Sequence, residues 1–206
     1  MGVLTSIAEL IAKGFPESVA QRIASGELPM DEASRLARAS DQGYGGVLYR
    51  GQPDRPLSSN QDIWASTSPD VAQTYADNFT VSHREALGED GIVVPLRTNA
   101  NNMAGVNARG KSWHVVESNN RKIPGIENGV LKGTDRISEA VRDSGAYDGT
   151  VFRNIPDDAV RLRGAEQADS YNILGTRPDV NIRHADAAYD PQYSGNNIMG
   201  SAVGTA

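Results

Sequence analysis

Residues 64–75 have the sequence WASTSPDVAQTY, in which the pattern of a strand changes to that of a helix. An aromatic and an apolar residue precede a run of hydroxyl side chains, as in a short strand that ends at a polar site. Serine is a preferred N-cap and proline is tolerated at the first helical position, so Ser68 and Pro69 predict a helix start. The helix would carry Tyr75 on its apolar face and end near residue 78. A capped strand-to-helix turn without any ligand explains the same residues.

A second polar strand end is predicted upstream of this stretch. Residues 47–49 predict a strand that ends at Arg50 and Gly51. Arginine suits bidentate contacts with phosphate, and glycine lets a ligand approach the main chain closely. If both strand ends border one cleft and Tyr75 offers a stacking face, the cleft suits a dinucleotide with an aromatic base. A surface ion pair for Arg50 and simple packing for Tyr75 are the alternatives.

The composition argues against several classes of protein. The chain has 206 residues and a formal net charge of −6, with basic and acidic residues interleaved. This balance argues against nucleic acid or an anionic membrane as the main partner. There is no cysteine and the three histidines lack ligand spacing, so we expect neither a disulfide nor a metal site. The absence of cysteine fits a cytosolic protein, and the sequence shows no apolar run that could span a bilayer and no signal-peptide pattern.

The whole chain predicts an α+β protein with three parts. Residues 1–43 have the patterns of short helices, residues 44–191 those of strands with helices and long loops, and residues 192–206 those of a flexible tail. Polar residues at 80–90 predict a mobile loop, and residues 98–133, rich in Asn, Gly and Ser, predict a functional or poorly ordered loop. Later strands are expected at residues 91–96, 150–152, 171–174 and 180–183.

The motifs around residues 49–75 resemble those of a known enzyme family. Residues 49–51 (YRG), then 66–68 (STS), then a helix containing Tyr75, resemble the first two motifs of ADP-ribosyltransferases of the Arg–Ser–Glu kind. Trp64 and Tyr75 also match the aromatic pair of the His–Tyr–Glu branch. The chain resembles in particular the ADP-ribosyltransferase-like domains of phage polyvalent proteins, over most of residues 28–191. Further short matches are residues 29–33, 35–39, 147–149, 153–154, 182–183 and 188–191.

The resemblance implies a split, twisted β core of mostly antiparallel strands that binds NAD. It implies transfer of ADP-ribose from NAD to a nucleophile, with release of nicotinamide. In this comparison Arg50 holds the phosphates, Gly51 contacts the nicotinamide amide and Ser66 braces the site. Trp64 and Tyr75 would stack on the nicotinamide. The implied cofactor-binding residues are Tyr49, Arg50, Gly51, Trp64, Ser66, Thr67 and Tyr75.

The catalytic glutamate of the family has no direct counterpart in this chain. In the family it lies at the start of a late strand, where residues 169–171 have the sequence DSY. A carboxylate there would stabilise the oxocarbenium that develops on the ribose, by charge and by a hydrogen bond to a ribose hydroxyl. We assign this role to Asp169, with Glu166 and Asp148 as further candidates, although solvated loop charges explain all three. The predicted catalytic residues are Arg50, Ser66 and Asp169.

Two classes of function follow from the resemblance. The first is a mono-ADP-ribosyltransferase that uses NAD as substrate, needs no metal and modifies a host protein, which the loops at 80–90 or 98–133 would contact. The second is a catalytically inactive module of the same fold, which serves in a virion or binds other phage proteins. NAD hydrolysis, with water as the acceptor, is a third possibility. The implied location is the host cytoplasm, reached by delivery from a virion.

Overall fold

The computed structural model describes residues 6–54, 57, 62–87, 90–119, 123, 130–156, 167–174 and 182–193. The helices are α1 (Ile7–Ala12), α2 (Glu17–Ala24), α3 (Glu32–Asp41), α4 (Pro69–Leu87) and α5 (Thr134–Ser144). The strands of the main sheet are β1 (Leu48–Pro53), β2 (Ile63–Ser66), β3 (Gly91–Thr98), β4 (Met103–Asn107), β7 (Gly149–Pro156), β8 (Gln167–Ile173) and β9 (Ile182–His184). Two short strands, β5 (Glu117–Ser118) and β6 (Leu131–Lys132), form a separate pair.

The main sheet has seven strands in the order β4-β7-β8-β2-β1-β3-β9. All neighbouring pairs are antiparallel except β4 and β7, which are parallel. The predicted α+β class and mostly antiparallel sheet are therefore confirmed. The strands predicted at residues 91–96, 150–152 and 171–174 correspond to β3, β7 and β8, whereas residues 180 and 181 of the last predicted strand lie outside the described residues.

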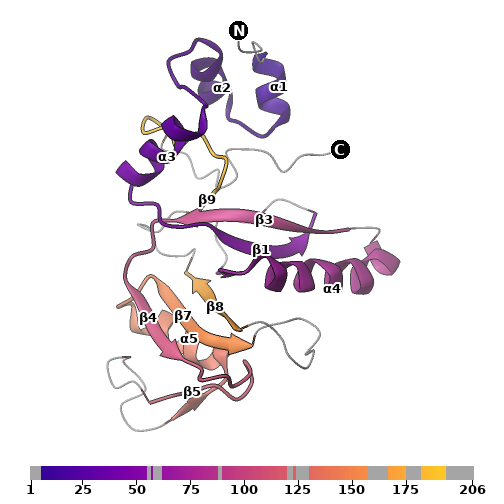
Figure 1. The fold of residues 1–206 in the computed structure, drawn as a ribbon, viewed down its shortest axis with the longest axis vertical. Helices are drawn as coiled ribbons and strands as arrows, with labels where there is room; N and C mark the ends of the chain where they lie inside the picture. Colours follow the sequence, from indigo (N-terminus) through magenta and orange to yellow (C-terminus); the bar gives the residue numbers. More distant parts are fainter. Residues whose placement is uncertain are drawn as a thin grey trace.

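The sheet narrows between β1 and β2, which share a single register pair, Tyr49 with Ser66. β1 continues beside β3 from Leu48 to Pro53, while β2 continues beside β8. In Figure 1 the β1–β3 part runs across the molecule and the β4–β7–β8 part slopes away below it. The two parts of the sheet thus separate within a few residues of this one pair.

Helix α4 lies directly against the β1–β3 part of the sheet (Figure 1). The Ser68 hydroxyl accepts the N–H of Val71 at 3.3 Å, as expected of the predicted cap. The contact with the strands is exceptionally close because two glycines face the helix. A methyl group on Gly51 would lie 2.0 Å from the carbonyl oxygen of Ala72, and one on Gly91 would lie 1.9 Å from that of Ala76.

The N-terminal helices form a layer above β9 (Figure 1). Ser6 and Glu9 form a capping box at the start of α1, and Asp31 caps α3 by accepting the N–H of Ser34. Apolar side chains of this segment, among them Phe15 and Val19, form a small core together with Ala188 from the segment after β9. The helices predicted within residues 1–43 are therefore present, while the division into three parts stays a prediction and residues 194–206 lie outside the described residues.

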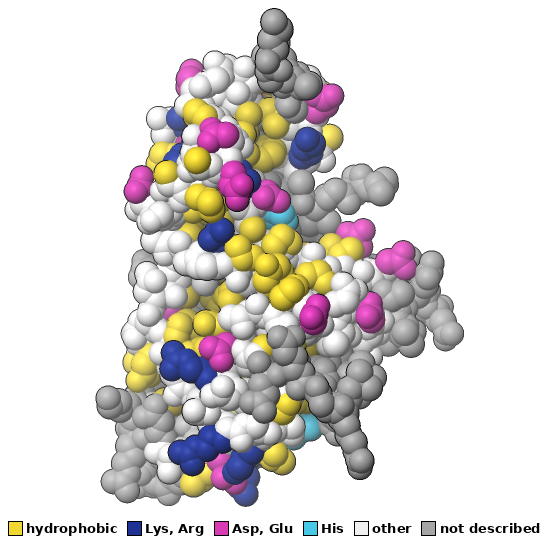
Figure 2. All heavy atoms as spheres, in the orientation of Figure 1, with side chains coloured by type: hydrophobic (Ala, Val, Ile, Leu, Met, Phe, Trp, Pro, Cys, Tyr) yellow, Lys and Arg dark blue, Asp and Glu magenta, His cyan; other side chains and the backbone are white. Residues whose placement is uncertain are grey.

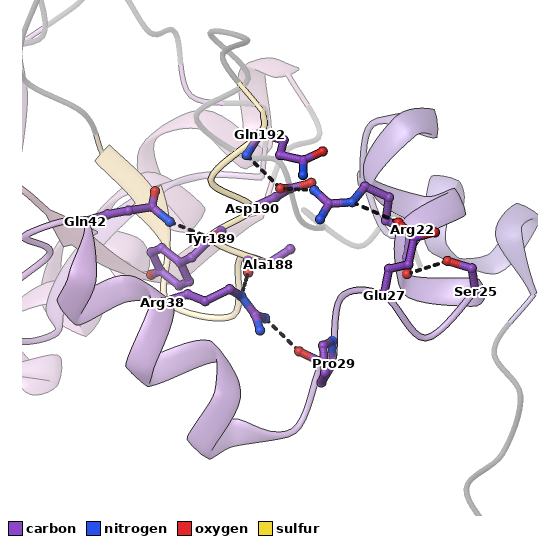
Figure 3. Close-up of polar contacts among 10 residues, drawn as sticks. All are labelled: Arg22, Ser25, Glu27, Pro29, Arg38, Gln42, Ala188, Tyr189, Asp190 and Gln192. Atoms are coloured by element: carbon purple, nitrogen blue, oxygen red, sulfur yellow. Dashed lines mark hydrogen bonds and ion pairs between the residues drawn. The ribbon is translucent and has the colours of Figure 1, made fainter.

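The segment after β9 holds these helices in place (Figure 3). Arg22 of α2 forms an ion pair with the buried carboxylate of Asp190. Arg38 of α3 donates to the carbonyl of Ala188 at 2.9 Å, and Gln42 donates to that of Tyr189 at 2.7 Å. Two sequence motifs noted above, at 35–39 and 188–191, therefore pack against each other although about 150 residues separate them.

Three predictions about the extent or presence of elements are wrong. Helix α4 runs to Leu87, so it does not end near residue 78, and residues 80–87 form no loop. Strand β1 runs to Pro53, so Arg50 and Gly51 lie inside the strand rather than at its end. Strand β4 lies within residues 98–133, where a loop was expected. For β1 and β4, pairing with a neighbouring strand makes a strand of polar or small residues that carry little local signal.

Candidate functional site

A cavity of about 230 Å³ lies where β1 and β2 separate, with α4 as its third wall. This volume lies below the roughly 300–1,000 Å³ typical of pockets that enclose a whole small ligand. It therefore suits a single ring or one end of a larger molecule. The lining residues are Tyr49, Arg50, Gly51, Trp64, Ala65, Ser66, Val71, Ala72 and Tyr75.

Six of the seven residues that the sequence assigned to cofactor binding line this cavity. The seventh, Thr67, does not. Its hydroxyl accepts the N–H of Asp169 at 3.2 Å and its own N–H donates to the carbonyl of Asp169 at 3.0 Å, so it joins β2 to β8. Sequence reasoning missed Ala65, Val71 and Ala72 as lining residues. Helical spacing after Ser68 placed Val71 and Ala72 on the inner face, which was a usable signal.

Arg50 bridges the gap between the two separating strands. Its Nε donates to Oε1 of Gln52 at 3.0 Å, and a terminal nitrogen donates to the carbonyl oxygen of Trp64 at 3.0 Å. Burial lowers the pKa of Arg50, because the guanidinium loses hydration, but an arginine pKa starts so far above neutrality that the group stays charged.

The charge of Arg50 is not neutralised by the protein around it. Within the described ranges, none of the ion pairs involves Arg50, which disfavours the surface ion pair considered above. A guanidinium has five N–H donors, and the contacts with Gln52 and Trp64 occupy two of them. The cavity therefore presents an uncompensated cation with donors to spare, which is what an anionic ligand requires.

Aromatic side chains supply much of the remaining wall. Trp64 stacks on the fully buried Phe152, with ring centroids 5.8 Å apart and planes inclined by 17°. One face of the indole is therefore covered by Phe152. Tyr49 and Tyr75 are half-buried and enter the same cavity from β1 and α4. Aromatic faces next to a buried cation suit a planar ring that is linked to a phosphate.

Ser66 ties together three elements at the end of β2. Its side chain is buried, its hydroxyl accepts the N–H of Ser68 at 3.2 Å, and it lies 3.5 Å from the carbonyl oxygen of Asp169 as a donor. The hydroxyl therefore links β2 with the start of α4 and with β8. This bonding restricts the geometry of the cavity wall.

Two of the candidate carboxylates, Asp169 and Asp148, are not among the lining residues of the cavity. The carboxylate of Asp169 accepts the N–H of Asn154 at 3.4 Å. The register of β8 pairs Ser170, not Asp169, with Ser66, so the position that shares a face with Ser66 carries a buried serine.

Asp148 lies at the opposite end of β8. Its carboxylate accepts the N–H groups of Asn101 and Asn102 at 3.1 and 2.9 Å. Glu166 lies outside the described residues. Among the described lining residues there is no Asp or Glu, so any carboxylate that acts on a bound ligand must come from beyond this lining.

The described part of the chain lacks two further features that would bear on its function. No cluster of three or more His, Asp or Glu side chains there is placed to hold a metal ion. None of the helices in that part combines the length and apolar character needed to cross a membrane.

The assignment of a function therefore rests on the residues of the cavity. Comparisons of this chain with models of known protein families, with curated proteins and with solved structures find no match.

Proposed function

We propose that the cavity between β1, β2 and α4 binds the nicotinamide end of NAD, and that the protein transfers ADP-ribose to an acceptor protein. The observation that carries this proposal is the uncompensated Arg50 beside three aromatic side chains in one small cavity. Arg50 would bind the diphosphate, and Trp64 and Tyr75 would contact the nicotinamide ring. The adenosine half would lie outside, because a cavity of about 230 Å³ is too small for a whole dinucleotide.

The reaction requires one bond to break and one to form at the ribose. The C–N bond to nicotinamide breaks and nicotinamide leaves with the electron pair. A nucleophilic atom of the acceptor forms the new bond to the same ribose carbon, and any proton on that atom passes to solvent or to a base. Held on aromatic faces and fixed through its diphosphate by Arg50, NAD would present this carbon toward the cavity mouth. The positive charge that develops on the ribose calls for a carboxylate, for which Asp169, Asp148 and Glu166 are the candidates.

A module that binds NAD without turnover is the second candidate function. It is favoured by the absence of Asp and Glu from the described lining residues and by the contact of Asp169 with Asn154. Stacking and phosphate contacts give affinity but do not stabilise a developing oxocarbenium. NAD hydrolysis shares the site of the first proposal, with water in place of the acceptor protein.

Binding is tested with a variant whose single tryptophan lies in the cavity. The chain has two tryptophans, so Trp113→Phe leaves Trp64 as the only indole reporter. We expect NAD to quench this fluorescence saturably, and Arg50→Ala in the same background to weaken binding about tenfold or more, because a charged phosphate contact is lost. Arg136→Ala, which removes an exposed arginine of α5, is the control and should bind as the parent does. A lack of saturable quenching contradicts every NAD-based proposal.

Turnover is tested by measuring nicotinamide release and protein labelling from labelled NAD in a cell lysate. Labelled protein that disappears with Arg50→Ala supports the transferase. Nicotinamide release without labelled protein indicates hydrolysis, and saturable binding without either supports the binding module. Asp169→Asn, Asp148→Asn and Glu166→Gln, compared side by side, identify the carboxylate, since loss of turnover with retained NAD binding is expected of that residue alone.

A further inference from the structure

A second cavity, of about 330 Å³, lies beside β4, the terminal strand of the main sheet. It shares no lining residue with the cavity at β1 and β2. Its walls come from β4, from the turn that follows this strand and from β5. The polar residues that matter for its chemistry are Asn107, Arg109, Lys111, Glu117 and Ser118.

Positive charge predominates at this second cavity, although the chain as a whole carries a net charge of −6. Arg109 and Lys111 line it directly. Among the described lining residues Glu117 is the single acid, and it is already engaged, because its carboxylate binds Lys111 at 2.9 Å and Lys132 at 3.4 Å. Figure 2 shows Lys and Arg side chains gathered at the lower end of the molecule, the end at which Figure 1 places β5.

Two arginines add positive charge that no acid offsets. The Arg153 guanidinium lies 3.7 Å from where a methyl group on Gly105 would stand, and Gly105 itself lines the cavity. Across the described stretches, neither Arg109 nor Arg153 takes part in an ion pair. Both guanidinium groups are thus available to an anionic partner.

The main chain at Arg109 is held in an unusual conformation. Arg109 has a φ of 52° and Asn154, beside it, a φ of 53°, in the left-handed region that costs a non-glycine residue on the order of 1 kcal/mol. Asn107 holds both residues, since its Oδ1 accepts the Arg109 N–H at 2.9 Å and the Asn154 side-chain amide at 3.3 Å. The N–H of Gly110 also donates to the Asn154 carbonyl at 2.9 Å. The direction in which the chain presents Arg109 is therefore fixed before any ligand arrives.

We propose that this cavity binds an acidic peptide segment. Three features argue for a peptide with carboxylate side chains: the excess of Lys and Arg, a volume suited to one or two side chains, and the position of β4 at the end of the sheet. A terminal strand can pair with an extended peptide through its outer edge, as in strand addition. The described lining contains no aromatic side chain on which a nucleic-acid base would stack, which favours peptide over single-stranded nucleic acid.

The acidic-peptide site adjoins the end of β2 through a short series of hydrogen bonds. Asn154, which binds Asn107, donates its N–H to the carboxylate of Asp169, and Asp169 in turn is bonded to Thr67. A peptide bound there would be linked by these bonds to the end of β2, where Ser66 lines the first cavity. Its role as the docking segment of an acceptor protein rests on the proposed function, whereas the binding of acidic peptide does not.

The test measures fluorescence anisotropy of a labelled oligo-glutamate peptide with the full chain and no NAD. We expect saturable binding that weakens as salt is added, and no comparable binding of an oligo-glutamine peptide of the same length. Arg109→Glu should weaken binding about tenfold or more, because an attractive charge becomes repulsive. Lys13→Glu, the same change at an exposed lysine of the helical segment, should leave binding within about twofold of the parent.

Circular dichroism melting of both variants shows whether they fold equally, and Arg153→Glu provides a second variant if Arg109→Glu does not fold. Equal binding of the two peptides, or equal binding by Arg109→Glu and Lys13→Glu, overturns the proposal. A single-stranded oligonucleotide of matched charge that binds more tightly than oligo-glutamate also overturns it, in favour of nucleic acid. Arg50→Ala should bind the peptide as the parent does, so failure of NAD binding and failure of peptide binding are distinguishable.

Discussion

Gly51 shows how one missing side chain sets the position of a helix. The sequence suggested that this glycine lets a ligand approach the main chain. In the structure, the space where its Cβ would stand is taken by the backbone of α4, 2.0 Å from the carbonyl oxygen of Ala72. Gly51 lines the cavity, but its hydrogen-only side chain is required by the helix that forms the opposite wall.

Gly51→Ala should therefore move α4 and destabilise the protein. A methyl group that meets backbone atoms cannot be accommodated by a rotamer change, so we expect a loss of about 3 kcal/mol in the free energy of unfolding, measured with urea. Gly46→Ala is the matched control, because nothing lies within 4 Å of a methyl group there, and it should change stability by less than about 0.5 kcal/mol. Equal stability of the two variants would show that α4 does not pack on β1 as described.

Arg50, the neighbour of Gly51, has a structural contact as well as a proposed ligand. β1 and β2 pair only at Tyr49 and Ser66, so the carbonyl of Trp64 has no partner strand on that side. The Arg50 guanidinium donates to this oxygen at 3.0 Å and takes the place of a ladder bond. A lysine has a single ammonium and cannot make this contact and hold Gln52 in the same planar geometry.

At the scale of elements, the segment after β9 fastens the helices to the sheet. Asp190 has a side chain only 4% exposed, and its partner Arg22 is 22% exposed. The same carboxylate accepts the N–H of Gln192 at 2.9 Å, so it also shapes the turn that follows. Loss of this carboxylate leaves the partly buried guanidinium with the exposed Glu27, 3.5 Å away, as its remaining described ion-pair partner.

Asp190→Ala should loosen α1 and α2 while the sheet stays intact. We expect a loss of about 3 kcal/mol in the stability of the helical segment, seen as faster amide hydrogen exchange in α1 and α2 with unchanged exchange in β7 and β8. Asp186→Ala is the control in the same segment: it removes a 69%-exposed carboxylate 3.2 Å from Arg35 and should cost less than about 1 kcal/mol. Uniform acceleration of exchange in both regions would mean that helices and sheet unfold as one unit.

For the molecule as a whole, His184 links stability to pH. Its Nδ1 accepts the N–H of Asp186 at 3.1 Å, which requires an unprotonated nitrogen. Burial lowers the pKa of His184 and outweighs the carboxylate of Asp186, which raises it, while Arg35 lowers it further. As pH falls through about 6.5, the unfolded chain binds a proton that the folded chain does not bind until lower pH. Stability contributed by neutral His184 is thus present above this pH and is lost below it.

His184→Gln should flatten this pH dependence. Between pH 7 and 5 we expect the parent to lose up to about 1.4 kcal/mol per pH unit from this one group, measured by urea unfolding at each pH. The variant should show a shallower slope over the same range. A slope that is the same in the parent and in His184→Gln would contradict the role of His184.

Much of the fold follows from local sequence patterns. The elements that were predicted wrongly are those whose residues carry a weak local signal. The capping box of Ser6 and Glu9, the cap of Ser68 and the apolar run of β3 are local signals, and each predicted element is present. Strand β4 was missed because its two buried residues, Ala104 and Val106, are small and few, so that pairing with β7 rather than its own sequence makes it a strand. The full length of α4 was missed because residues 80–87 are mostly polar and show little apolar periodicity in the sequence.

Residue types and their order determined the candidate site in outline. The resemblance carried by Tyr49-Arg50-Gly51, the strand ending in hydroxyls and the capped helix with Tyr75 named six residues that line one cavity. A guanidinium next to aromatic rings favours an anionic ligand with a planar ring, and this preference comes from the side chains themselves rather than from the fold.

Tertiary structure alone decided where these side chains meet and that the carboxylate of Asp169 is not among the lining residues. The cavity exists because β1 and β2 separate after one register pair, and such a separation depends on how each strand pairs with its other neighbour. The register of β8 places Ser170 opposite Ser66 and leaves Asp169 bonded to Asn154, outside the cavity lining. Arg109 and Arg153 likewise meet near the cavity at β4, although no local pattern connects them. Arg153 lies on β7, and Arg109 lies in the turn that follows the neighbouring strand β4.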